Sequence, residues 1–95
     1  MNEYELVYVA QPELDEDGMT ALNDRITDWI KTAQGEITAT EVWGRRQLAY
    51  PIRKYREGIY VLRRLQLPPS ATATLERSLR LNEAVLRHLL IRKEA

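Results

Sequence analysis

The 95-residue chain contains no cysteine, a single histidine and only four glycines. Without cysteine it has no disulfide framework, no thiolate zinc site and no cysteine nucleophile. The one histidine, His88, has no second histidine or carboxylate pair at helical spacing beside it, so we expect no metal site. Gly44 and Gly58 stand alone in the sequence, which excludes a glycine-rich phosphate loop.

The residues that remain for catalysis do not form a known catalytic pattern. Ser70 and Ser78 lie in or at a predicted helix, and neither sits in a nucleophile-elbow sequence. The acidic cluster at residues 13–17 lacks the spacing and the terminal glutamate of a calcium loop. Helix capping and solvation explain that cluster better. We therefore expect no catalytic residue, no cofactor, no metal and no small-molecule substrate, and predict that the protein is not an enzyme.

Long apolar runs are also missing. The longest are far too short to span a bilayer, so no membrane partner is expected. The N-terminal segment MNEYELVYVA is acidic and does not have the basic start of a signal peptide. These features predict a cytoplasmic protein.

The formal net charge is zero, but the charges are unevenly distributed along the chain. Residues 1–41 hold ten acidic and two basic residues, whereas residues 42–95 hold twelve basic and four acidic residues. This asymmetry favours a basic binding surface on one side of the fold. The alternative is a globule in which the two halves neutralise each other.

The hydrophobic pattern predicts four strands and two helices. Strands are expected at residues 4–10, 36–43, 59–67 and 85–91, where apolar residues alternate or β-branched residues gather. A long amphipathic helix is expected between an N-cap at Asp15 and a terminating Gly35. A second helix follows Ser70, its expected cap, and buries Leu75 and Leu79.

This order predicts a fold of the α+β class, the ferredoxin-like split βαβ arrangement (β-α-β-β-α-β), as a single domain over residues 1–95. Right-handed crossovers then place both helices on one face of a four-stranded antiparallel sheet. The second and fourth strands become the edges, and the other face stays open. Free edges and an open sheet face are both potential binding surfaces.

Basic and aromatic residues gather between the predicted second and third strands. Arg45 and Arg46 are expected in a turn, with Tyr50 and a basic connector at residues 52–58 soon after. Arginine interleaved with aromatic rings suits phosphate contact and base stacking. A solvated connector that serves only solubility is the alternative.

Arg87 lies in the last predicted strand and shares its face with Val85, Leu89 and Ile91. If that face is the open one, Arg87 is a charge on an apolar surface formed with Val7, Val9 and Leu62. Such a patch usually marks an interaction surface. Because both faces of this strand are apolar, a slip of one residue reverses the assignment, and both orientations remain open.

A series of short segments occurs in a fixed order along the chain. They are Tyr4-Glu5 and Pro12-Glu13-Leu14-Asp15, then Gly44-Arg45-Arg46-Gln47-Leu48-Ala49-Tyr50-Pro51-Ile52, then Glu57-Gly58-Ile59-Tyr60-Val61, Leu79-Arg80-Leu81-Asn82-Glu83 and Val85-Leu86-Arg87-His88-Leu89-Leu90. Together they resemble the family of bacterial small-subunit ribosomal protein six over nearly the whole chain. The resemblance implies a place on the platform of the small subunit. There the family binds central-domain ribosomal RNA cooperatively with ribosomal protein eighteen during assembly.

The resemblance also implies site residues. For RNA binding they are Tyr4, Arg45, Arg46 and Arg87, with Arg92 and Lys93 as helpers. For the partner protein they are Val42, Trp43, Arg45, Arg46, Leu48 and Tyr50. Asn2 and Glu3 stand where some relatives have arginines, which shifts the expected RNA contact towards Arg87.

Two other classes share the predicted topology. A ligand-sensing regulatory domain that acts as a dimer needs a pocket at a dimer interface, and the glycine-lined loop typical of such sensors is not apparent. A small phosphatase-like enzyme needs an arginine-lined phosphate loop after the first strand, where this chain has Gln11, Pro12 and Glu13. Topology alone does not choose among the three classes.

Overall fold

The chain folds into four strands and two α-helices in the computed structural model, which describes residues 1–93. The elements are β1 (Asn2–Ala10), α1 (Glu16–Thr32), β2 (Glu36–Ile52), β3 (Tyr55–Leu67), a 3-10 turn (Pro69–Ala71), α2 (Thr72–Leu81) and β4 (Val85–Lys93). The sheet has the order β2-β3-β1-β4, and its neighbouring strands are antiparallel. This confirms the predicted ferredoxin-like fold, with β2 and β4 as the edges.

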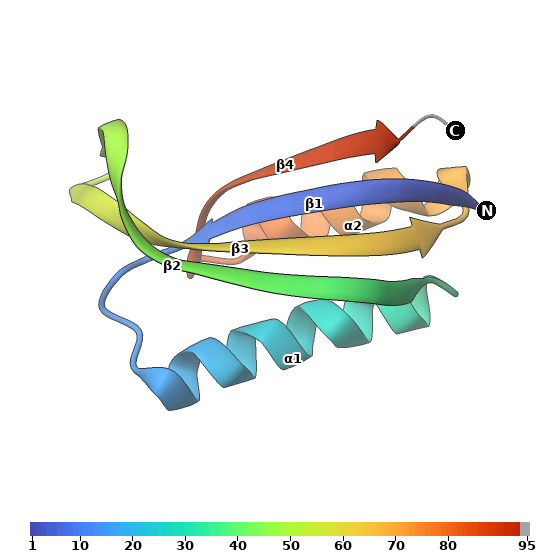
Figure 1. Cartoon of the computed structure of the whole chain (residues 1–95), viewed down its shortest axis with the longest axis horizontal. Helices are drawn as coiled ribbons and strands as arrows, with labels where there is room; N and C mark the ends of the chain where they lie inside the picture. Colours follow the sequence, from blue (N-terminus) through green and yellow to red (C-terminus); the bar gives the residue numbers. More distant parts are fainter. Residues whose placement is uncertain (94–95) are drawn as a thin grey trace.

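Both helices lie on one side of the sheet, and the main core fills the space between them (Figure 1). The even-numbered residues of β1 point into this core, with Leu6 and Tyr8 fully buried. They meet Ile26 and Ile30, which share one stripe of α1 because they are four residues apart. Leu75 and Leu79 of α2 are buried against the same cluster, as predicted.

The start of α1 follows the sequence prediction closely. The Asp15 carboxylate accepts a hydrogen bond from the Gly18 amide at 2.7 Å, so Asp15 is the N-cap. The helix ends at Thr32, and Gln34 rather than Gly35 takes the positive φ, at 66°. Gly35 is required for a different reason. A Cβ there would lie 2.7 Å from the Gln66 carbonyl oxygen and would overlap the Leu67 side chain.

Helix α2 corrects a second expectation. The predicted cap at Ser70 is wrong, because α2 begins at Thr72 behind the 3-10 turn and Ala71 is its N-cap residue, with no side-chain cap bond. The Thr72 hydroxyl donates to the Pro69 carbonyl at 3.0 Å. Two consecutive prolines fix the backbone before the helix, so the turn is set by their geometry and no side-chain cap is needed.

The region between β2 and β3 differs most from the prediction. Arg45 and Arg46 do not lie in a turn, since both are paired with β3 inside a strand that continues to Ile52. The expected connector is a tight hairpin whose turn contains Arg53 and Lys54. Gly44 has φ 82° at a register shift in β2. Such bulges bend a strand, and edge strands also tolerate proline, so Gly44 and Pro51 are both compatible with a long edge strand.

The bent hairpin curls away from the plane of the sheet (Figure 1) and forms a second, smaller core. Val9, Leu48 and Leu86 are its buried members. Val9 belongs to the face opposite the helices, so this end of the open face is covered by the hairpin itself. Gly58 is the point of closest approach, because a Cβ there would overlap the Val9 side chain.

Candidate nucleic-acid interface

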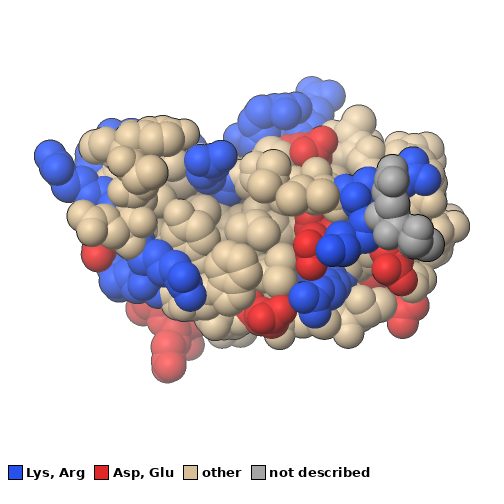
Figure 2. Space-filling view, turned by 45° about the horizontal axis from the view of Figure 1, so that its top comes forward, with Lys and Arg blue, Asp and Glu red and all other residues tan. Residues whose placement is uncertain are grey.

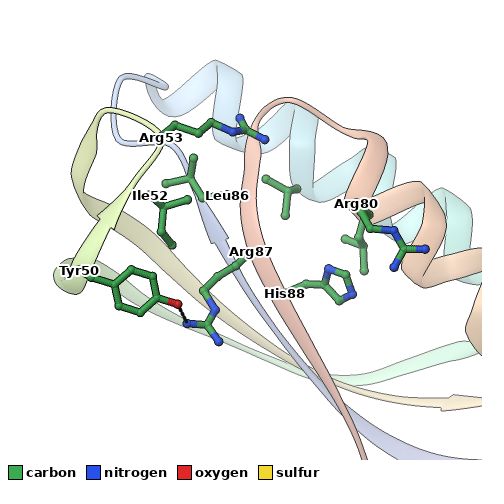
Figure 3. A pocket seen from close by; sticks show the side chains of 9 residues that line it. Tyr50, Ile52, Arg53, Arg80, Leu86, Arg87 and His88 are labelled. Atoms are coloured by element: carbon green, nitrogen blue, oxygen red, sulfur yellow. Dashed lines mark hydrogen bonds between the residues drawn. The ribbon is translucent and has the colours of Figure 1, made fainter.

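Arg87 lies on the sheet face that the helices leave open. It is paired with Val9 of β1, whereas the next residue, His88, is paired with the core residue Tyr8. Successive side chains of a strand point to opposite faces, so this register decides between the two orientations of β4. The Arg87 side chain crosses towards the hairpin, where its Nη1 donates to the Tyr50 hydroxyl at 3.3 Å (Figure 3).

A second cluster continues from Arg87 across the same face. Tyr60 of β3 and Arg87 of β4 are both paired with Val9, which lies between them in β1, and both line one cavity of the open face. The Trp43 ring stacks on Tyr60 with ring centroids 6.4 Å apart and an angle of 15° between the ring planes. The Arg46 guanidinium lies 5.4 Å from the centroid of the Trp43 ring. Residues from three strands thus form one row of arginine and aromatic side chains, which we call the arginine–aromatic row: Arg46, Trp43, Tyr60, Arg87 and Tyr50.

Arg45 lies apart from this row although it is adjacent to Arg46 in sequence. It is paired with Ile59, which packs against the helix-side core. Its Nη1 lies 3.2 Å from Glu57 Oε1, and its Nη2 donates to the Pro12 carbonyl at 3.0 Å. Arg45 therefore ties the hairpin to the loop before α1.

At the other end of the open face the charges are paired. Arg64 bonds Glu5 at 3.1 Å and lies 3.5 Å from Glu41, while Lys93 lies 3.5 Å from Glu5. The hydrogen bond from Arg64 is the main cause that lowers the pKa of Glu5, and Lys93 adds to it. Figure 2 shows acidic side chains interleaved with basic ones at this end and an uncharged area in the middle of the face. This end is therefore close to neutral.

The remaining residues implied for the site are spread over different environments. Tyr4 is 7% exposed in the main core and Leu48 is buried beneath the hairpin, so neither offers a ring or methyl surface to a ligand. Arg92 is exposed and paired with Tyr4, which puts it on the helix side, whereas Lys93 joins the ion-pair network on the open side. The apolar patch is smaller than expected, because Val9 and Leu62 are buried. Leu89 and Ile91 remain exposed.

Sequence reasoning missed Tyr60, Arg64 and Arg80 as parts of this surface. Tyr60 and Arg64 alternate with buried residues of β3, so strand periodicity could have placed them on the open face. Arg80 is in the last turn of α2, beside the start of β4, and only the tertiary structure shows this neighbourhood.

His88 is on the helix side, where its Nε2 lies 3.2 Å from Glu76 of α2. Within residues 1–93, His, Asp and Glu side chains form no group of three or more that could hold a metal ion. Neither α1 nor α2 is both long enough and apolar enough to cross a membrane.

The fold, with the arginine–aromatic row on its open sheet face, places this chain among the split-βαβ proteins. A crystal structure of 30S ribosomal protein S6 from Thermotoga maritima matches with a TM-score of 0.90 and 26% sequence identity, over 97% of this chain and 87% of that one. A family model for ribosomal protein S6 matches residues 3–92. The small ribosomal subunit protein bS6 of Desulforamulus reducens is 39% identical over 93 residues, 98% of each chain. That of Salinispora arenicola is 47% identical over 94 residues, 99% of this chain and 98% of the relative.

The chain belongs to the ribosomal protein S6 family, which confirms the resemblance seen in the sequence. It is accordingly a structural ribosomal protein and not an enzyme.

Proposed function

We propose that this protein binds central-domain ribosomal RNA of the small subunit, cooperatively with ribosomal protein eighteen, during subunit assembly in the cytoplasm. The observation that carries the proposal is the arginine–aromatic row, in which Arg87 meets Tyr50 and Arg46 meets Trp43 on one sheet face.

The row offers the two kinds of contact that RNA recognition uses. Arg87 spends one of its five N–H donors on Tyr50, and the others remain available for phosphate or base edges. Tyr50 is 58% exposed and Trp43 is 40% exposed, so each presents ring surface on which an unpaired base could stack. Arg92 lies near the end of β4 on the helix side, and Lys93 lies 3.5 Å from Glu5 on the open side, so neither belongs to the row. Because Tyr4 is buried, we assign it to the core rather than to the RNA contact.

The free edge of β2 supports the protein contact. Val42 is 64% exposed next to Trp43, and among residues 1–93 β3 is the only strand that pairs with β2. Val42 borders a cavity of about 570 Å³ that is also lined by Asp15, Glu16 and Asp17 at the start of α1. An exposed edge with an apolar and an acidic component suits a basic protein partner. Arg45 and Leu48 support this surface from beneath, through the loop bond and the small core.

The charge distribution predicts that RNA binding by this protein alone is weak. Arg45, Arg64 and Lys93 are engaged with carboxylates. Of the residues implied for RNA binding, this leaves the three cations Arg46, Arg87 and Arg92 for phosphates. Three phosphate contacts correspond to a slope of about −2 to −3 in log K against log salt. A second, basic protein would supply the rest of the affinity.

A gel-shift titration with a central-domain RNA fragment tests the proposal, with and without ribosomal protein eighteen and at two salt concentrations. A duplex of equal length from another domain is the control RNA. We expect at least tenfold tighter binding when both proteins are present, and weaker binding at the higher salt. Equal affinity for the control duplex, or no effect of the second protein, contradicts the proposal.

A further inference from the structure

A cavity of about 550 Å³ opens at the β4 edge, where three separate elements meet (Figure 3). The hairpin contributes Tyr50, Ile52 and Arg53, the end of α2 contributes Arg80, and β4 contributes Leu86 and Arg87. Because its walls come from three elements, the cavity depends on the hairpin being curled over the sheet. We call it the edge pocket.

The rim of the edge pocket is basic. Arg53, Arg80 and Arg87 line it, and none of the described lining residues is a carboxylate. Arg53 Nη1 donates to the Glu83 carbonyl at 2.7 Å, which leaves its other donors available. Arg80 makes no side-chain hydrogen bond or ion pair with any residue among 1–93. Three guanidinium groups around one cavity favour an anionic ligand.

The floor of the edge pocket is apolar. Leu79, Val85 and Leu86 are 9% exposed or less, and half-buried Ile52 extends the floor towards Tyr50. A phosphate group alone gains nothing from such a floor, whereas a planar base does. The volume lies within the range of pockets that hold small organic ligands. The edge pocket therefore suits a ligand with a flat, weakly polar part and an anionic part.

The backbone conformation of Arg53 is a separate observation that points to the same pocket. Its φ is 55°, a left-handed conformation that Gly, Asn and Asp adopt far more readily in two-residue hairpin turns. A strained arginine at such a position is unfavourable for the turn itself. Strain of this kind persists only where the surrounding structure holds it in place, and it clusters at functional sites. Here it places a guanidinium at the rim of the edge pocket.

We propose that the edge pocket takes one unpaired nucleotide of the bound RNA, with the base on the apolar floor beside Tyr50 and a phosphate among the three arginines. The inference rests on the proposed RNA-binding function and deepens it. It assigns to Arg53 and Arg80 a role in recognising single-stranded RNA. Contacts to the phosphates of a duplex would not need such a pocket. Recognition of splayed, unpaired bases is the usual route to specificity for RNA.

The test is an abasic scan of the RNA in the complex with ribosomal protein eighteen. Each unpaired nucleotide of the central-domain fragment is replaced in turn by an abasic residue, and affinities are measured for wild type, Arg80→Gln and Arg53→Asn. Asparagine is chosen at residue 53 because it accepts the positive φ. Arg77→Gln, on the same helix but outside the pocket lining, is the matched control.

We expect one abasic site to weaken wild-type binding about tenfold and to have little additional effect in Arg80→Gln and Arg53→Asn. Such non-additivity marks a direct coupling between base and pocket. Arg77→Gln should retain the full effect of that abasic site. If every abasic site weakens binding by the same factor in wild type and in the pocket variants, the inference is overturned and the proposed function stands. If the wild-type protein does not bind the RNA at all, the proposed function is refuted instead.

Two further measurements distinguish an RNA nucleotide from other possible ligands of the edge pocket. Titration of the free protein with each nucleoside 5′-monophosphate, followed by NMR shifts of β4 amides, should show only millimolar affinity. Micromolar binding identifies a free nucleotide as the ligand and overturns the RNA source. If Arg80→Gln weakens binding to ribosomal protein eighteen tenfold in the absence of RNA, the pocket holds a side chain of the partner protein, which also overturns the inference.

Discussion

Arg63 is a charged side chain in the core, and its replacement gives a sharp test of how the core is stabilised. The residue is 6% exposed on the helix side of β3. Its Nη1 donates to the Thr27 hydroxyl at 3.0 Å and its Nη2 to the Asn23 carbonyl at 3.3 Å. Its Nε has no hydrogen-bond partner among the described residues, and neither hydrogen-bonding partner is a carboxylate.

The balance of these effects predicts different results for two substitutions. Burying an ion costs several kcal/mol, and the unpaired Nε adds about 1–3 kcal/mol. Two hydrogen bonds from a charged group return about 3–6 kcal/mol, so the net is near zero. Arg63→Met removes both the cost of burying the charge and the gain from the two hydrogen bonds. It should leave the free energy of unfolding within about 1 kcal/mol of wild type. Arg63→Lys keeps the buried charge but loses the planar guanidinium that bonds both Thr27 and Asn23. It should destabilise the protein by about 2–3 kcal/mol.

The assay is urea denaturation at pH 7, with Arg77→Met on the exposed side of α2 as a control expected within about 0.5 kcal/mol of wild type. In the methionine variant the Asn23 carbonyl still accepts from the Thr27 hydroxyl, at 2.9 Å, so no new unpaired acceptor is left there. A lysine variant as stable as the methionine variant refutes the reasoning. It would mean that the charge itself, and not the geometry of the guanidinium, is what this site accommodates.

Other variants test other parts of the fold. Gly35→Ala should destabilise by about 1–3 kcal/mol in the same assay, because its Cβ overlaps Leu67; a neutral result contradicts the packing described for that turn. Burial raises the pKa of Tyr8 to about 12 from its usual 10.0, so its contribution to stability is complete below pH 10 and is lost as the pH rises towards 12. Wild type should therefore lose about 2–3 kcal/mol more than Tyr8→Phe over that range, and parallel curves would contradict this. The pKa of Glu5 is lowered from 4.5, so wild type should exceed Glu5→Gln in stability at pH 6, with the difference lost as the pH falls below 4.5; a difference that persists at pH 3 is the contrary result.

The sequence predicts the regular parts of the fold well because each has a local cause. Asp15 caps α1 through its own side chain, and the periodicity of Ile26 and Ile30 identifies the buried stripe. The alternation in β1 correctly separates Leu6 and Tyr8 from Val7. These features depend on residues close together in the chain.

The hairpin was predicted poorly because its structure depends on tertiary contacts. The predicted strand ends at residue 43, just before Gly44, yet β2 continues past Gly44 and through Pro51 because its pairing with β3 resumes after a bulge. Leu48 was assigned to a partner surface, but the curl of the hairpin buries it against Val9 and Leu86. The same curl brings Tyr50 to Arg87, a contact across 37 positions of sequence that no local pattern indicates.

The sequence places Arg87 in a strand but does not decide which face of the sheet its side chain is on. Leu86, Leu89 and Ile91 give β4 apolar residues on both faces, and the pairing of Val9 with Arg87 removes the ambiguity. Arg45 and Arg46 show the opposite case, since two adjacent arginines look equivalent and the structure separates them to opposite faces.

The role of the open sheet face is tested most directly by comparing Arg87→Ala with Arg77→Ala in the complex with ribosomal protein eighteen and central-domain RNA. Loss of charged hydrogen bonds of about 1.5–3 kcal/mol should weaken binding by Arg87→Ala roughly 10- to 100-fold. The slope of log K against log salt should become shallower by about 1. Arg77→Ala should bind like wild type. If the two variants bind equally well, RNA does not contact the open face at Arg87, and the arginine–aromatic row is not the RNA-binding site.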